Sequence, residues 1–215
     1  MAGTPVNSRI LQRQRRWISR LGAVSCWFVV LLPGATAGSP TDASQLEKGV
    51  FLVAGRDLAG SLFEKTVIFI TDYDANGAVG LIINRPTDIP LTRLLPDVHK
   101  PAQNTDKLYI GGPVVPRGLF LLMRTDRSHA VQNRVIADVS FAVGVDALIH
   151  MLKNAGPTDV VRAYSGYAGW QPGQLEAEIS HGDWLVVHDD TALIFDADPR
   201  QIWVDLMKKW SGHWL

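Results

Sequence analysis

The sequence predicts an α+β fold with a mostly antiparallel sheet. Two apolar, β-branched runs, residues 66–71 and 78–83, are separated by a short polar segment that ends in Asn76-Gly77. This pattern is typical of a tight reversal between neighbouring strands. Several strand patterns occur close together along the chain, whereas the helical patterns come late, which differs from the regular strand–helix alternation of a doubly wound parallel sheet.

The first 37 residues have the order of a secretory signal. They contain five arginines and no acidic residue, followed by the apolar run 21–32 and the small residues Ala35-Thr36-Ala37. Because twelve residues are too few to cross a bilayer of about 30 Å as a helix, we expect cleavage after Ala37 and a periplasmic or secreted product. A retained anchor through residues 17–37, or a mis-annotated start before a cytoplasmic protein, is the alternative.

After the signal, residues 38–48 are predicted to be a polar linker and residues 49–215 a single domain. The chain has 47% hydrophobic and 20% charged residues, which is ordinary for a globular protein. Its one cysteine, Cys26, lies in the apolar run, so the cleaved product has no thiol for a disulfide, catalysis or metal binding. Residues 38–215 carry 16 basic and 21 acidic side chains, a net charge of −5, and we do not expect nucleic-acid binding.

The strands are predicted where short apolar runs are bounded by turn residues. They are residues 50–53, 66–71, 78–83, 108–110, 119–123, 160–164, 184–187 and 192–195. The two runs on either side of Asn76-Gly77 are apolar at nearly every position, so they are predicted to form a central hairpin covered on both faces. The strands 108–110 and 119–123 are predicted to form a second pair, followed by an exposed loop over 124–134.

The helices are predicted from apolar spacing and from turn chemistry. Val145, Leu148, Ile149 and Leu152 recur at helical spacing and define an amphipathic helix that ends before Gly156-Pro157. Shorter helices are expected over 91–95 and 174–179. The last helix is expected to start at Asp198-Pro199, with the aspartate as its cap.

Residues 165–178 contain three glycines, Tyr167 and Trp170, and are predicted to form a glycine-shaped turn that leads into the helix at 174. Four other motifs come before this block along the chain. They are Phe51-Leu52-Val53-Ala54, Phe63-Glu64-Lys65-Thr66-Val67, Gly77-Ala78-Val79-Gly80 running into Asn84-Arg85-Pro86, and Gly111-Gly112-Pro113-Val114, with the block itself continuing to Trp184-Leu185.

Together these motifs resemble the YqgE/AlgH family over residues 48–205. The resemblance implies a bent antiparallel sheet partly closed into a small barrel and flanked by helices. Members are mostly uncharacterised, and some are labelled transcriptional regulators. The chain departs from the family pattern at residues 72–74, where members often carry a histidine, and at residues 59–62, where they often carry Asp-Pro. Members are also thought to be cytosolic and to begin near the first strand.

A ligand pocket is predicted from aromatic walls combined with a few polar groups. Backbone N–H groups of consecutive glycines can hold an anion, and an arginine can add a fixed positive charge. The candidate residues are Asn84, Arg85, Gly111, Gly112, Tyr167, Trp170, Gln174 and Glu176. The alternative is structural, with the glycines in a turn, the aromatics in the core and Arg85 paired with an acid such as Glu176.

Two further groups of residues could bind a metal or catalyse hydrolysis, but their positions in the sequence favour a structural role. His181, Asp183, His188, Asp189 and Asp190 are potential metal ligands, yet an extended strand would hold the two histidines roughly 20 Å apart, so they are interpreted as turn residues. Ser165, His181 and Asp183 could form a hydrolytic triad, but Ser165 lacks the glycine pattern of a nucleophile elbow and is interpreted as a turn serine. We therefore expect neither a metal nor a cofactor.

The leading functional hypothesis is a non-enzymatic binding or accessory protein exported to the bacterial cell envelope, with a small molecule or another protein as its partner. The first alternative is a cytosolic transcriptional regulator, and the second is a Ser/His/Asp hydrolase. Contact with a membrane is expected only through residues 17–37, and only if they are not cleaved.

Overall fold

The computed structural model describes residues 43–93, 107–126, 133–136 and 138–210. All of them belong to the unit formed by residues 36–215. The predicted signal peptide lies outside the described residues, and the predicted linker is described only from residue 43, where Ala43–Gln45 forms the 3₁₀ turn η1.

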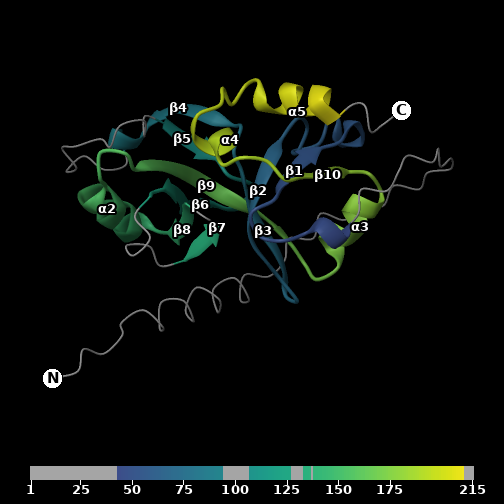
Figure 1. The fold of residues 1–215 in the computed structure, drawn as a ribbon, viewed down its shortest axis with the longest axis horizontal. Coiled ribbons are helices and arrows are strands. Elements are labelled where there is room, and N and C mark those ends of the chain that lie inside the picture. Colours follow the sequence, from purple (N-terminus) through teal and green to yellow (C-terminus); the bar gives the residue numbers. More distant parts are fainter. Residues whose placement is uncertain (1–42, 94–106, 127–132, 137, 211–215) are drawn as a thin grey trace. The chain divides into compact units, whose positions relative to one another are not determined.

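The described residues contain ten strands joined in one sheet (Figure 1). The main order is β10-β1-β2-β3-β9-β6-β8-β7, and β5 pairs with both β4 and β9. All pairings are antiparallel except β5 with β9, which confirms the predicted α+β class with a mostly antiparallel sheet. The strands are β1 (Phe51–Ala54), β2 (Val67–Asp74), β3 (Gly77–Ile82), β4 (Pro86–Pro90), β5 (Lys107–Ile110), β6 (Val114–Arg124), β7 (Arg134–Ile136), β8 (Val139–Val143), β9 (Val160–Trp170) and β10 (Trp184–Val187).

The predicted central hairpin is confirmed. β2 and β3 pair in a register that sets Asp74 opposite Gly77, and they lie between β1 and β9. By contrast, β5 and β6 are not neighbours as predicted, because β9 inserts between them, parallel to β5 and antiparallel to β6. The short strands β4, β7 and β8 were not predicted. β4 begins and ends with proline, which a strand tolerates at a position where no ladder hydrogen bond is needed.

β9 continues through the segment that was predicted to be a turn. Ser165 pairs with Leu119 and Tyr167 with Val114, so β6 carries a register shift opposite Gly166. Gly166 has φ +72°, which bends the strand without ending it. The last residues of β9 then pair with β3 and extend the sheet towards β1 and β10. The turn expected within residues 165–178 is therefore wrong over residues 165–170, which belong to β9, and the three glycines serve a bent strand and the start of α3.

The sheet is not closed into a barrel, which corrects the expectation drawn from the family resemblance. Its order ends at β10 and β7, and no ladder joins these two strands in the described part of the chain. Gly49, just before β1, lies against Ile136 of β7, since a Cβ on Gly49 would be 2.2 Å from Ile136 Cγ2.

Helices cover both faces of the sheet (Figure 1). α2 packs with Leu121, Val161 and Ala163, whereas α4 and α5 pack on the opposite face with Tyr164 and Leu122. α3 contributes Leu175 and Ile179 to a further cluster around β1, β2 and β10. The described helices are η2 (Arg56–Leu58), η3 (Leu91–Arg93), α2 (Val145–Asn154), α3 (Gln174–Ser180), α4 (Ala192–Phe195) and α5 (Ile202–Trp210). None of them is long and apolar enough to cross a membrane.

Two helix starts show the effect of aspartate capping. The predicted strand at residues 192–195 is instead α4, because Asp190 Oδ1 accepts a hydrogen bond from the Ala192 N–H at 2.8 Å and turns the chain. Asp198 Oδ1 accepts from the Arg200 N–H at 3.0 Å, which confirms the predicted role of Asp198 before α5. In both cases the carboxylate satisfies a backbone donor that the first turn leaves unpaired.

Candidate functional site

Asn84 and Arg85 hold the end of β3 to the segment before β2. The Asn84 side chain accepts from the Val67 N–H at 2.9 Å and donates to the Lys65 carbonyl at 2.9 Å. Arg85 Nη2 donates to the Glu64 carbonyl at 3.2 Å. Burial lowers the pKa of Arg85, and the nearby charge of Glu64 opposes this shift. The expected alternative pairing of Arg85 with Glu176 is not what the structure shows.

Gly111 and Gly112 lie directly against β9. The Gly111 N–H donates to the Ser165 carbonyl at 2.8 Å, and its carbonyl accepts from the Ile82 N–H at 2.9 Å. A Cβ on Gly112 would lie 2.2 Å from the Tyr167 carbonyl carbon. The Gly111 N–H is thus engaged in the sheet and is not directed at a ligand.

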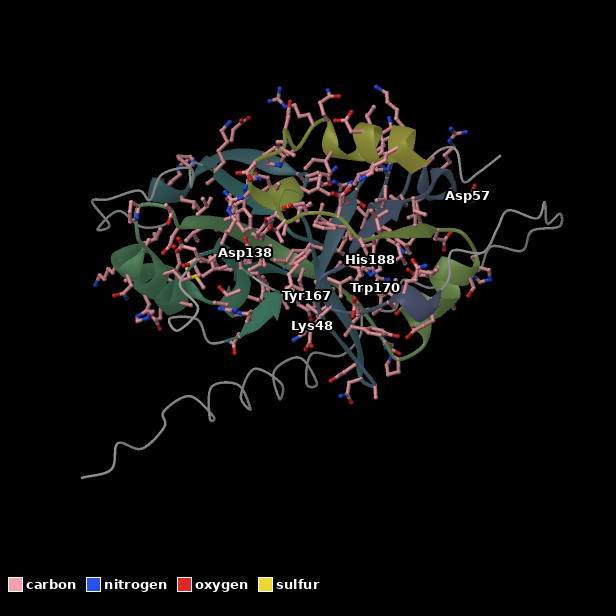
Figure 2. The ribbon with its side chains drawn as sticks, in the orientation of Figure 1. Lys48, Asp57, Asp138, Tyr167, Trp170 and His188 are labelled. Carbon is pink, nitrogen blue, oxygen red and sulfur yellow. The ribbon has the colours of Figure 1, made fainter. Side chains whose placement is uncertain are left out.

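Tyr167 and Trp170, both labelled in Figure 2, belong to different parts of the core. Each side chain is 7% exposed. Tyr167 packs on the ring of Phe120 with centroids 5.2 Å apart, and burial raises the pKa of its hydroxyl. Trp170 packs edge-on against Trp184 at 6.0 Å. The two aromatics therefore do not form the walls of one pocket.

Gln174 and Trp170 are brought together by Glu178, a residue that the sequence did not single out. Glu178 Oε2 accepts from the indole N–H groups of Trp170 at 2.7 Å and Trp184 at 2.9 Å, and Oε1 accepts from Gln174 Nε2 at 2.9 Å. We call these four residues the Glu178 clamp. Glu176 faces another neighbour and accepts from the Tyr73 hydroxyl at 2.7 Å.

The candidate triad is not assembled by hydrogen bonds. The Ser165 hydroxyl donates to the Pro116 carbonyl, whereas His181 is exposed at the end of α3. Burial raises the pKa of Asp183, the charges of Glu178 and Asp57 raise it further, and His181 opposes the shift. Among the described residues, no hydrogen bond links Ser165 to His181 or Asp183.

The potential metal ligands are likewise dispersed. His188 lies after β10 and is 3.5 Å from a carboxylate oxygen of Glu47, while the Asp189 carboxylate accepts from Lys209 at 2.8 Å. Within the ranges that the structure describes, no three His, Cys, Asp or Glu residues are grouped so that they could hold a metal ion.

A pocket that sequence reasoning missed lies between η2 and α5. Its volume is about 240 Å³, and its lining consists of Arg56, Trp203, Val204, Met207 and Lys208. The indole N–H of Trp203 donates to the Ala54 carbonyl at 2.8 Å, which fixes this wall against β1. Figure 2 labels Asp57, next to Arg56, beside the end of α5. No local sequence pattern indicates that α5 lies beside Arg56, because the two segments are far apart along the chain.

Comparisons with known proteins agree on one relationship. A family model described as AlgH-like matches residues 51–215. A UPF0301 protein of Methylococcus capsulatus is 39% identical over 163 residues, which cover 74% of this chain and 89% of the relative. A UPF0301 protein of Marinomonas is 38% identical over 152 residues, covering 69% and 80%.

Two solved structures have similar folds. The solution structure of the AlgH protein from Pseudomonas aeruginosa matches with a TM-score of 0.58 and 30% identity, over 82% of this chain and 92% of that one. The crystal structure of a Corynebacterium diphtheriae protein matches with a TM-score of 0.63 over 77% and 87% of the two chains, and at 22% identity this similarity concerns the fold alone.

Proposed function

The chain belongs to the AlgH-like family, and we propose that it acts as an exported binding or accessory protein of the cell envelope and not as an enzyme. The observation that carries this proposal is the lining of the pocket between η2 and α5. Its five residues supply apolar surface and two cations but no carboxylate, imidazole, hydroxyl or thiol. Such a pocket can hold a ligand, and its lining contains no nucleophile paired with an adjacent base, the arrangement that activates a nucleophile in covalent catalysis.

The polar contacts of Ser165, Glu176 and Glu178 support the same view. The Ser165 hydroxyl is engaged by a backbone carbonyl, and the carboxylates of Glu176 and Glu178 accept hydrogen bonds from side chains that pack in or beside the core. These hydrogen bonds stabilise the fold. The proposal therefore assigns binding to the surface of η2 and α5.

Binding is tested with the neutral fluorescent probe N-phenyl-1-naphthylamine and the purified protein. We expect the probe fluorescence to rise and saturate as protein is added. The affinity derived from this titration should be at least tenfold lower in Val204→Trp, because the indole would fill the pocket. The matched control is Val145→Trp on α2, where the side chain is 49% exposed and outside the pocket. Unchanged probe binding in Val204→Trp, or no binding by the unmodified protein, would contradict the proposal.

The proposal of export rests on the N-terminal sequence pattern, in which five arginines precede the apolar run 21–32 and the small residues 35–37. A fusion of residues 1–45 to alkaline phosphatase, which is active only outside the cytoplasm, is expected to be active in bacteria. Placing two arginines in the apolar run with Val29→Arg and Val30→Arg is expected to abolish that activity. An inactive unmodified fusion would instead favour the cytosolic alternative.

A further inference from the structure

We propose that the pocket between η2 and α5 binds an amphipathic anion, meaning a carboxylate or phosphate head attached to a short apolar body. This inference rests on the proposed binding function and specifies the ligand class. Two walls of different chemistry carry it: an apolar floor from α5 and a cationic rim from η2 and the last turn of α5.

The floor is formed by Trp203, Val204 and Met207, which are all partly buried. The indole of Trp203 is held by the Ala54 carbonyl, so this wall is fixed before a ligand arrives and little rotamer entropy is lost on binding. Met207 is a flexible, polarizable side chain that adapts to ligands of differing shape. A volume of about 240 Å³ is below the range of about 300–1,000 Å³ for drug-sized ligands and therefore suits a short apolar body.

The rim contains two cationic side chains, Arg56 and Lys208. Arg56 is exposed, and its guanidinium makes no hydrogen bond or ion pair with any residue that the structure describes. Lys208 lies across the pocket on α5. The adjacent Asp57 is not part of the lining, and its charge acts on Asp183. A guanidinium has five donors in a fixed geometry that matches a carboxylate or phosphate, so the unengaged Arg56 is the group that selects an anionic head.

The cationic rim differs in sign from the net charge of residues 38–215. Residues 38–215 carry a net charge of −5, so a generally cationic surface does not explain an anion preference. The attraction is local, and for exposed charges it is screened within a Debye length of about 8–10 Å at physiological salt. Anion binding at this pocket should therefore weaken with added salt, while the apolar contribution should not.

The test compares three ligands with the same ten-carbon chain by isothermal titration calorimetry: decanoate, decanol and decylammonium. We expect decanoate to bind about tenfold more tightly than decanol, a difference of about 1.4 kcal/mol, and decylammonium to bind most weakly. Arg56→Gln should reduce the affinity for decanoate to that for decanol and leave decanol unchanged. Arg117→Gln, an exposed arginine on β6 outside the pocket, is the matched control and should change neither.

The outcomes separate this inference from the proposed function. If decanol and decanoate bind equally and Val204→Trp abolishes both, the pocket is a binding site and the anion inference is overturned. If neither binds and the neutral naphthyl probe also fails, both proposals are overturned. Binding to vesicles of phosphatidylglycerol and of phosphatidylcholine then identifies the source of the anion. Arg56-dependent binding to the anionic phosphatidylglycerol vesicles indicates a lipid headgroup. Binding of decanoate without binding to these vesicles indicates a free ligand.

Discussion

Replacing Gly166 with alanine is expected to lower the free energy of unfolding by about 3–5 kcal/mol, combining left-handed backbone strain with steric overlap. Gly166 has φ +72° at the bend of β9. A Cβ there would lie 2.2 Å from the Gly112 carbonyl oxygen and 3.0 Å from the Val114 carbonyl oxygen. Both are backbone atoms, one in the connection between β5 and β6 and one at the start of β6, so they cannot rotate aside as a side chain could. Urea denaturation measures the change.

Gly173→Ala is the matched control for this substitution. Gly173 has φ +78°, almost the same backbone conformation, but a Cβ there would meet nothing within 4 Å. Its cost should be the strain alone, about 1–2 kcal/mol. The difference between the two variants therefore isolates the close approach of β9 to Gly112. Equal costs would show that the strands are not packed as closely as the structure indicates.

These glycines illustrate what the sequence could and could not predict. Their spacing correctly indicated conformations that only glycine takes easily, but a glycine with positive φ occurs both in turns and in strands that another backbone approaches closely. Choosing between the two requires knowledge of what lies opposite, which at Gly166 is Gly112, 54 residues earlier. The hairpin of β2 and β3 could be predicted because both its strands and its turn are encoded within 16 residues.

Residues 192–195 were ambiguous for another reason. A four-residue apolar run fits a buried strand or one turn of helix, and periodicity cannot separate them over so short a length. The deciding contact is the Asp190 carboxylate, which accepts a hydrogen bond from the Ala192 N–H at the start of the helix. For α5, a helix of nine residues, the aspartate-proline pair at 198–199 was enough to predict a helix.

The candidate site was harder to predict than the fold because its members come from distant segments. Glutamates at 176 and 178 look equivalent in the sequence, yet only Glu178 reaches both indoles while Glu176 reaches Tyr73. The pocket between η2 and α5 joins residues about 150 positions apart. Residue types could suggest an arginine beside aromatic and apolar groups, but only tertiary packing shows that Arg56 lies beside Trp203 and Met207.

Glu178→Ala is expected to lower the free energy of unfolding by about 2–5 kcal/mol, because each buried donor left without an acceptor costs about 1–3 kcal/mol. The two donors are the indole N–H groups of Trp170 and Trp184, whose side chains are 7% and 1% exposed. Alanine offers them no acceptor, and their packing leaves little access for water. Urea denaturation followed by tryptophan fluorescence measures the loss and reports on the same indoles.

Two variants separate the acceptor role of Glu178 from general effects on α3. Glu176→Ala lies on the same helix and removes one hydrogen bond from Tyr73, which keeps access to solvent, so its cost should stay within about 1 kcal/mol. Glu178→Gln keeps one oxygen that can serve both indoles, and Gln174 is exposed enough to bond with water instead, so its cost should fall between the two alanine variants. If Glu178→Ala were no more costly than Glu176→Ala, the Glu178 clamp would contribute no specific stability. If Glu178→Gln were as costly as Glu178→Ala, the negative charge and not the shared acceptor would hold the two indoles.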